Sequence, residues 1–240
     1  MTRVAIIAAM AGELKPLVRG WTHERRGNVD LWRWKFDEGE WVAACGGAGV
    51  NAATLAFAEV EKDGAVDLVI STGWAGALSP ELKTGNVYSV SGVIDARTGE
   101  RFRVAIWNGE RWLVTSPIVA DEAEKQRLAS AYKAELVDME AASIARLAQM
   151  RDIPFYCFKG VSDGFTDKLP DFNRFIRTNG QFDLTAMVLF SILRPWHWPA
   201  LMRMGENSKR ASLGIRDSLL DFLDGRGDIR HRNGYPNGKH

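Results

Sequence analysis

The stretch Val4-Ala5-Ile6-Ile7-Ala8-Ala9 is a continuous apolar run close to the start of the chain. A run of this length without polar alternation is typical of a strand that is buried on both faces of a sheet. Residues 10–18 come next and predict a turn followed by a short helix. Because strands buried on both faces occur in parallel sheets covered by helices, this segment indicates an α/β protein.

The order of strand, turn and helix recurs along the chain. Glycines follow two of the strands, in Gly46-Gly47-Ala48-Gly49 and in Gly73-Trp74-Ala75-Gly76. We expect strands at residues 29–37, 41–45, 67–71, 87–94, 101–106 and 154–161, and helices at residues 51–62, 121–132 and 138–150. The strands at 87–94 and 101–106 belong to a more antiparallel middle. The alternation predicts a three-layer α/β sandwich with a mixed, mostly parallel central sheet flanked by helices.

The C-terminal part of the chain has a different pattern. Residues 182–193 are apolar and predict a helix, which the prolines of residues 194–199 end because proline lacks a backbone donor. Residues 200–222 are amphipathic and predict a second helix. We expect one domain over residues 1–224, with residues 182–224 as its helical part, and a disordered polar tail over residues 225–240.

Composition limits the class of protein. The 240 residues are 46% hydrophobic and 25% charged, as in a soluble globular protein, and the formal net charge of +1 does not favour binding to nucleic acid. Cys45 and Cys157 cannot form a disulfide framework, so we expect reduced thiols and a cytoplasmic protein. No apolar run approaches the roughly 20 residues that span a bilayer, and no targeting segment is evident.

Three acidic residues lie where strands and helices meet. Glu13 follows the first strand, Asp163 ends the strand at 154–161, and Glu140 falls in the first turn of a helix that Asp138 caps. In an open α/β sheet, the carboxyl ends of the strands and the N-termini of helices face the same crevice, so three carboxylates can converge there. Taken singly, each acid has an ordinary explanation, since a Glu in a first helical turn often serves only the helix dipole.

The glycine segment at residues 45–49 lies between a strand and a helix, where backbone amides can approach an anion or a sugar. It lacks the third glycine of a dinucleotide-binding loop, and the chain has no Walker pattern. The four histidines have no metal-ligand spacing. We therefore expect no metal and no cofactor, and the glycines by themselves are equally explained by turn geometry.

Five segments together resemble the nucleoside phosphorylase and nucleosidase superfamily. The pattern is most similar to that of methylthioadenosine/adenosylhomocysteine nucleosidases, and it extends from residue 4 to about residue 165. The Met-Glu pair followed 23 residues later by Ser-Asp is its most specific part. The segments are Val4-Ala5-Ile6-Ile7-Ala8-Ala9-Met10 with Glu13, Gly47-Ala48-Gly49-Val50-Asn51-Ala52-Ala53, Ser71-Thr72-Gly73-Trp74-Ala75-Gly76, Val137-Asp138-Met139-Glu140-Ala141-Ala142 and Val161-Ser162-Asp163.

The resemblance implies an enzyme that breaks the bond between adenine and a 5′-substituted ribose through an oxocarbenium-like sugar. Asp163 matches the general acid that assists the leaving purine, and Glu13 matches the general base that activates water. Glu140 matches the residue that holds the ribose hydroxyls, and Met139 packs against the sugar. Further substrate-binding positions are Gly47, Trp74, Val119 and Ser162. The resemblance also implies a homodimer, with water or inorganic phosphate as co-substrate.

The C-terminal part is similar to the hopanoid-associated phosphorylases, whose members are implicated in removing adenine from adenosylhopane. A lipid nucleoside is therefore an alternative substrate, and an apolar lip formed by Trp196, Trp198, Leu201 and Met202 would then touch a membrane surface transiently. Two helices that simply pack on the sheet are the ordinary explanation of this part. The chain also departs from the nucleosidase pattern at positions Cys45, Gly49, Trp74 and Ala77.

A third alternative is a nucleoside-binding protein without activity, because a fold does not fix a function.

Overall fold

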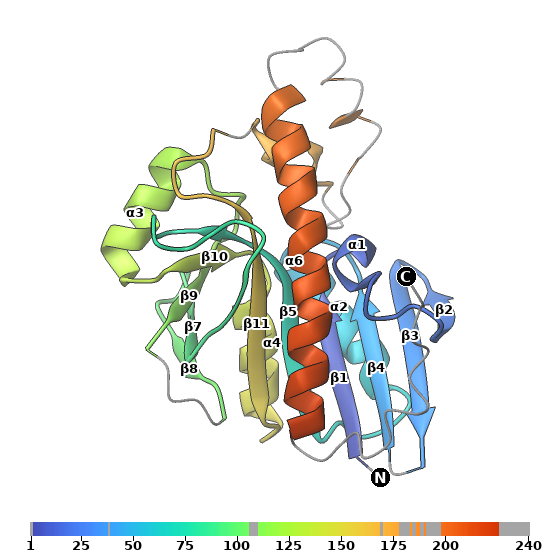
Figure 1. Cartoon of the computed structure of the whole chain (residues 1–240). Coiled ribbons are helices and arrows are strands. Elements are labelled where there is room, and N and C mark those ends of the chain that lie inside the picture. Colours follow the sequence, from blue (N-terminus) through green and yellow to red (C-terminus); the bar gives the residue numbers. More distant parts are fainter. Residues whose placement is uncertain are drawn as a thin grey trace.

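The centre of the molecule is a single mixed sheet (Figure 1). The computed structural model describes residues 2–37, 39–105, 110–168, 170–177, 183, 186–187, 190 and 198–225. Eleven strands of this part join the sheet. In chain order they are β1 (Thr2–Ala8), β2 (Thr22–Arg26), β3 (Val29–Phe36), β4 (Gly39–Cys45), β5 (Leu68–Ala77), β6 (Val87–Ser89), β7 (Gly92–Asp95), β8 (Arg101–Arg103), β9 (Trp112–Thr115), β10 (Leu136–Asp138) and β11 (Phe155–Asp163).

The strand order explains why the candidate residues meet. The order is β2-β3-β4-β1-β5-β10-β9-β7-β8, and β11 pairs with β5 and β6. Strand β1 is parallel to both β4 and β5, with Val4 opposite Trp41 on one side and Leu68 on the other. Strand β11 is also parallel to β5. The carboxyl ends of β1, β5 and β11 therefore lie at one end of the sheet.

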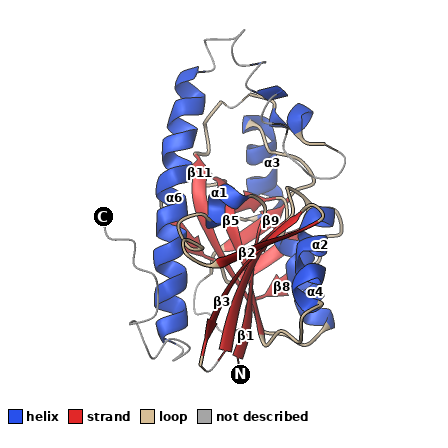
Figure 2. Cartoon of the chain, turned by 90° about the vertical axis from the view of Figure 1, so that its right-hand side faces the viewer, coloured by secondary structure: helices blue, strands red, loops and turns tan. Residues whose placement is uncertain are grey.

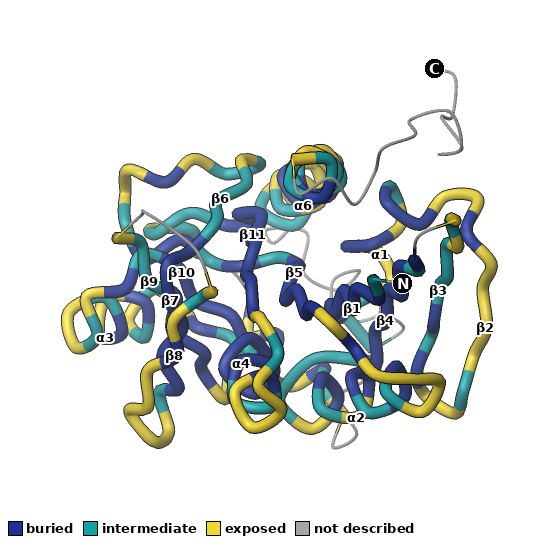
Figure 3. The backbone as a smooth tube through the Cα atoms, turned by 90° about the horizontal axis from the view of Figure 1, so that it is seen from below, coloured by how far each residue is buried: buried dark blue, intermediate teal, exposed yellow. Residues whose placement is uncertain are grey.

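Helices cover both faces of the sheet, as Figures 2 and 3 show. Helices α2 (Val50–Glu61) and α4 (Ala141–Met150) pack on one face, and α1 (Ala11–Leu14) and α6 (Trp198–Gly225) pack on the other. Helix α3 (Glu122–Tyr132) lies beside β9 and β10, and a short 3-10 helix, η1 (Phe172–Phe175), follows β11. The predicted three-layer α/β sandwich with a mixed central sheet is confirmed.

The side chains of β1 show why its sequence is an unbroken apolar run. Ala5 and Ile7 belong to the core beneath α2 and α4, whereas Val4 and Ile6 belong to the core beneath α1 and α6. All four side chains are almost fully buried. Since neighbouring strand residues point to opposite faces, a strand with helices on both sides needs apolar residues at every position.

Several predicted boundaries differ from the structure. The strand predicted at 101–106 is β8, which ends at Arg103. The segment 87–94 forms two strands, β6 and β7, which pair with β11 and with β8 and β9 in different parts of the sheet. Strand β5 continues through its glycines to Ala77 instead of ending at residue 71. Strand β11 likewise continues to Asp163. In β5 and β11 the cause is pairing, because the two strands pair with one another as far as Gly76 and Asp163, with a register shift between Val161 and Asp163. Ala77, the last residue of β5, pairs with Leu136 of β10.

The second of the predicted C-terminal helices is present as α6, which begins two residues earlier than predicted, at Trp198. Pro199 is tolerated because a proline in the first turn sacrifices no helical hydrogen bond. The predicted helix at 182–193 and Trp196 lie largely or wholly outside the described residues. The predicted break at 194–199 lies outside them as far as residue 197, and its last two residues, Trp198 and Pro199, belong to α6. The predicted tail at 225–240 also lies outside them except for Gly225, the last residue of α6. In the described part of the chain, no helix is both long and apolar enough to cross a membrane.

Candidate active site

Glu13 is held in place by three backbone amides. It lies in α1, directly after β1, and its carboxylate accepts hydrogen bonds from Ala9 N, Met10 N and Trp74 N, each at 2.8 Å. A Cβ atom at Gly73 would lie 2.7 Å from Oε1 of Glu13, so only glycine leaves room for this carboxylate beside β5. Burial raises the pKa of Glu13 above its usual value, although the three amide donors oppose that shift.

Glu140 connects α4 to the glycine loop. Its Oε1 accepts a hydrogen bond of 2.7 Å from Gly49 N, so the loop does present an amide to this end of the sheet. The prediction that Glu140 lies in the first turn of the helix is wrong, because Glu140 is the N-cap residue and α4 begins at Ala141. Burial, reinforced by the negative charge of Asp138, raises the pKa of Glu140 to about 8.

Asp138 does not cap α4 in the predicted sense; it is the last residue of β10. Its Oδ2 accepts a hydrogen bond from Ala141 N at 2.9 Å and lies 2.8 Å from Nζ of Lys159. Its Oδ1 accepts a hydrogen bond from Thr115 Oγ1 at 2.7 Å. Asp138 therefore fixes the turn that carries Glu140, and its partner Lys159 is a site residue that the sequence argument missed.

Lys159 lies on β11 beneath the acidic residues. Its side chain is 1% exposed, and its Nζ also donates to Thr72 O on β5 at 3.1 Å. Burial by itself would lower the pKa of Lys159, but the negative charge of Asp138 opposes this and the pKa is raised, so this lysine stays charged. Its positive charge acts on Glu13 as well as on Glu140. Glu13, Glu140, Asp138 and Lys159 thus form one buried charge cluster.

Asp163 is further along β11 and has a lysine partner of its own. Its Oδ1 accepts a hydrogen bond of 2.6 Å from Ser162 Oγ, and its Oδ2 is paired with Nζ of Lys125 from α3. Both Lys125 and Asp163 are buried. No pattern in the sequence predicted a role for Lys125. In the sequence it is one charged residue on a polar helix, and only the position of α3 against β11 turns its side chain inward.

The other predicted substrate-binding residues lie around these groups. Met139 is half-buried between Asp138 and Glu140, and Gly47, also half-buried, donates its backbone N–H to Ala9 O at 2.9 Å. The indole N–H of Trp74 is directed at α6, where it approaches Ser208 O at 3.1 Å and Ser212 Oγ at 3.0 Å.

The backbone N–H and carbonyl of Val119 both form hydrogen bonds with the side chain of Asn173. Its N–H donates to Oδ1 of Asn173 at 2.7 Å, and its carbonyl accepts from Nδ2 of the same residue at 3.1 Å. Asn173 belongs to η1, which follows β11. It is a third residue near the predicted site that the sequence argument did not identify.

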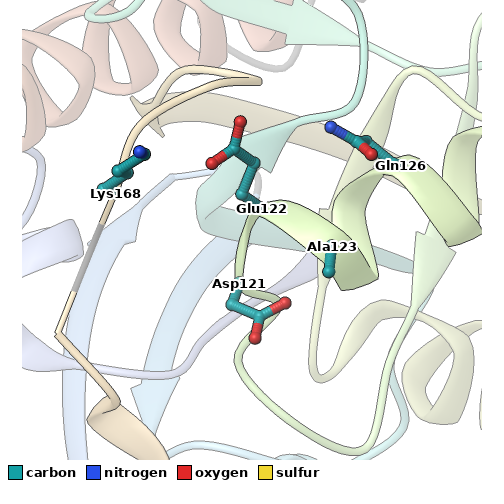
Figure 4. Close-up of a pocket in the computed structure, with 5 residues that line it drawn as sticks. All are labelled: Asp121, Glu122, Ala123, Gln126 and Lys168. Atoms are coloured by element: carbon teal, nitrogen blue, oxygen red, sulfur yellow. The ribbon is translucent and has the colours of Figure 1, made fainter.

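A hollow of about 420 Å³ lies at the start of α3 (Figure 4). Glu122 and Lys168 approach it from opposite sides. Its lining residues are Asp121, Glu122, Ala123, Gln126 and Lys168. None of these was predicted as a site residue. We place the chemistry at the buried acids, because a general acid or base needs a controlled protonation state and the hollow is lined by exposed or half-buried side chains.

Neither cysteine is suited to act as a nucleophile. Cys45 and Cys157 are buried, and burial raises the pKa of each thiol to about 12. The thiolate is the reactive form, so both are almost wholly unreactive at neutral pH. Among the residues that the structure describes, no group of histidine, cysteine and acidic side chains is arranged to hold a metal ion.

Comparison with protein families decides the wider relationship. The family model described as the phosphorylase superfamily matches residues 3–110 and 96–188, which is most of the chain. The chain belongs to the phosphorylase superfamily. The predicted membership of the nucleoside phosphorylase and nucleosidase superfamily is therefore confirmed. The prediction that the chain is an enzyme of this group is confirmed as well.

Individual relatives of this superfamily member are nucleosidases. It is 25% identical over 212 residues to the aminodeoxyfutalosine nucleosidase of Campylobacter jejuni, covering 73% of this chain and 92% of that protein. Its fold is shared with the 5′-methylthioadenosine/S-adenosylhomocysteine nucleosidase of Helicobacter pylori, solved with butyl-thio-DADMe-Immucillin-A (TM-score 0.70, 17% identity, 94% and 99% coverage). It is also shared with the 5′-methylthioadenosine nucleosidase of Arabidopsis thaliana (TM-score 0.70, 16% identity, 100% and 98% coverage). These relatives support the predicted class of activity, cleavage of a nucleoside.

Proposed function

We propose that this enzyme hydrolyses the N-glycosidic bond of a 5′-substituted adenine nucleoside and releases adenine. The observation that carries the proposal is the set of buried carboxylates, Glu13, Glu140 and Asp163, each held by hydrogen bonds at the same end of the sheet. Burying three acids is costly unless they are used or paired. A structural role would not require three of them at the point where β1, β5 and β11 end.

The three acids divide the reaction between them. Breaking the glycosidic bond leaves a positively charged, oxocarbenium-like sugar, and the purine departs with the electron pair. Glu140 binds the ribose hydroxyls as a carboxylate, Asp163 transfers a proton to the departing base, and Glu13 accepts a proton from the attacking water. The carboxylate of Glu13 is oriented by three amides, so it can receive that proton without reorganisation.

The charges at the site favour water, and not phosphate, as the acceptor of the sugar. The two lysines placed at the site in the described part of the chain, Lys125 and Lys159, are both paired with carboxylates. Neither is free to neutralise a phosphate, which would otherwise have to rely on backbone amides alone. The products test this directly, because hydrolysis gives the free sugar whereas phosphorolysis gives the sugar 1-phosphate.

The candidate substrates differ in the group attached to the 5′ carbon of the ribose. We favour methylthioadenosine and adenosylhomocysteine, in keeping with the sequence motifs. The name of the relative from Campylobacter jejuni adds aminodeoxyfutalosine as a further substrate to test.

The decisive experiment is an adenine-release assay with purified protein. Methylthioadenosine, adenosylhomocysteine, aminodeoxyfutalosine and adenosine are each incubated with and without inorganic phosphate, and free adenine and the sugar product are measured. We expect release of adenine without phosphate, loss of release in Glu13→Gln, and full release in Glu81→Gln, which changes an exposed acid. Binding of these nucleosides without any turnover would instead indicate a nucleoside-binding protein.

A lipid nucleoside is a second candidate substrate, and the start of α6 favours it. Trp198 is 49% exposed and Met202 is 67% exposed, one helical turn apart. A long apolar 5′ substituent would need such an entrance, since it cannot remain in water. Co-sedimentation with phosphatidylcholine and phosphatidylglycerol vesicles tests this: binding by the wild type that is lost in Trp198→Ser/Met202→Ser supports it. Absence of binding together with efficient turnover of methylthioadenosine rejects it.

A further inference from the structure

Lys125 and Asp163 form a buried pair between α3 and β11. Lys125 is 1% exposed, and its Nζ donates to Oδ2 of Asp163 and, at 2.5 Å, to Gly164 O. The opposite oxygen of Asp163 accepts from Ser162 Oγ at 2.6 Å. Both carboxylate oxygens thus receive a donor, and one of these donors is a cation. The N–H protons of the Lys125 cation therefore lie directly against a carboxylate oxygen of Asp163.

The residue of β5 that packs against this pair is a glycine, Gly76, which leaves space for both side chains. A Cβ atom at Gly76 of β5 would lie 3.1 Å from Oδ2 of Asp163 and 3.2 Å from Cε of Lys125. Helix α3 is otherwise a polar helix, in which Leu128 is the other buried side chain. An apolar residue at position 125 would join α3 to the sheet at lower cost, because a buried ion pair is seldom more stabilising than the apolar side chains that can replace it. The lysine therefore calls for a chemical explanation.

We propose that Lys125 is the source of the proton that the departing base receives, and that Asp163 relays this proton. The inference rests on the proposed nucleosidase function, in which Asp163 assists the leaving purine. Lys125 acts through Asp163 and does not itself contact the substrate. Asp163 would then begin and end each turnover as a carboxylate, whereas a lone aspartic acid would have to enter the reaction already protonated.

The step balances in atoms and charge. The bond between the sugar C1′ and the purine N9 breaks, and both of its electrons leave with the purine. Asp163 passes a proton to a ring nitrogen of the purine as an N–H bond of Lys125 breaks and its electron pair stays on Nζ. Lys125 becomes a neutral amine, and it recovers a proton from water after adenine leaves. The attacking water gives one proton to Glu13 and its O–H group to C1′, and Glu13 later releases that proton to solvent.

Two substrates with different leaving groups separate this role from a structural one. Adenine needs a proton in order to leave, whereas the 4-nitrophenolate of 4-nitrophenyl β-D-riboside leaves as a stable anion. For Lys125→Met we expect kcat with methylthioadenosine to fall by about 10²–10⁴-fold, the range typical of general acid catalysis, and kcat/KM for the aryl riboside to stay within about threefold. Arg127→Met is the matched control, since it removes a cation from the exposed face of the same helix.

Rescue experiments keep the test decisive even if Lys125→Met folds poorly. In Lys125→Ala, propylammonium should restore part of the lost kcat with methylthioadenosine in a saturable way, because it replaces the missing cation in the space that the side chain leaves. Lys125→Arg keeps the positive charge but releases its proton far less readily, so it should fold like the wild type and remain slow with methylthioadenosine. Adding Lys125→Met to Asp163→Asn should cause little further loss, since both act in one step.

Several outcomes would overturn the inference. Unchanged kcat with methylthioadenosine in Lys125→Met would show that the lysine only packs, and equal losses on both substrates would show a general structural role. A fully active Lys125→Arg would show that charge alone suffices and that no proton is supplied. A wild type that cleaves the aryl riboside but no adenine nucleoside would overturn the proposed function together with this inference, whereas the first three outcomes leave the proposed function standing.

Discussion

The backbone amide of Trp74 lies 2.8 Å from Oε1 of Glu13, and this hydrogen bond joins strand β5 to the first helix. The same residue donates its indole N–H toward Ser208 and Ser212 of α6. One residue in the middle of a strand therefore connects the candidate general base with the C-terminal helix. The position of Glu13 depends on the main chain of Trp74, and the docking of α6 depends on its side chain.

This division gives the first prediction. Trp74→Phe keeps the amide and removes the indole donor, so we expect a loss of about 1–2 kcal/mol in the free energy of unfolding, measured by urea denaturation. The kcat for adenine release should stay within about threefold. Ser212→Ala should cost a similar amount, and the double variant should cost less than the sum. A large fall in kcat at unchanged stability would mean that the indole itself contacts substrate.

Asp163→Asn should lower kcat for adenine release by about 10²–10⁴-fold while KM changes little. The amide can still form hydrogen bonds to Ser162 and to the base, but it cannot pass on a proton. Steady-state kinetics with methylthioadenosine measure the effect, and circular dichroism of the variant checks that it is folded. An unchanged kcat would assign Asp163 to structure alone.

The activity should rise with pH through the titration of Glu140. Because its pKa is raised to about 8, Glu140 keeps its proton at neutral pH and becomes a carboxylate only as the pH passes this value. Ribose binding needs the carboxylate, so kcat/KM should increase from pH 6 to about pH 9, apart from any loss at still higher pH. Glu140→Gln should have a low kcat/KM without this rise. A wild-type profile that is flat between pH 6 and 9 would contradict the assignment.

Removing one partner of the Lys159–Asp138 pair should lower the free energy of unfolding. Lys159→Met leaves Asp138 as an unpaired buried charge, so we expect a loss of about 3–5 kcal/mol in the free energy of unfolding. Lys159→Met/Asp138→Asn should recover part of this loss, because the second change removes the unpaired charge. Guanidinium denaturation of the three proteins measures both steps. Additive losses in the double variant would show that the two residues do not depend on each other.

Asn173 should compete with the nucleoside for Val119. Its carboxamide engages both the N–H and the carbonyl of Val119, which the sequence resemblance assigns to substrate binding. Asn173→Ala frees both groups, so we expect KM for methylthioadenosine to fall several-fold with kcat nearly unchanged. Asn173→Asp can accept from the N–H but cannot donate to the carbonyl, and it should have an intermediate KM. A higher KM in Asn173→Ala would show that the asparagine supports the site instead of blocking it.

The sequence by itself determined the layered architecture and the candidate acids. The apolar run at residues 4–9 needs a helix layer on both faces, and an unbroken apolar run is a local property that can be read from the sequence alone. Glu13, Glu140 and Asp163 were found because each falls next to the end of a strand or the start of a helix, within a recognisable motif.

Only the tertiary structure decided what surrounds those acids. Lys125 is 38 residues from Asp163, Lys159 is 21 residues from Asp138 and Asn173 is 54 residues from Val119, so no local pattern relates them. The split of residues 87–94 into β6 and β7, and the extension of β5 to Ala77, follow from pairing with distant strands. Which residues form a charge pair, and where a strand ends, depend on the distant segments that folding brings together. The local sequence does not specify those segments.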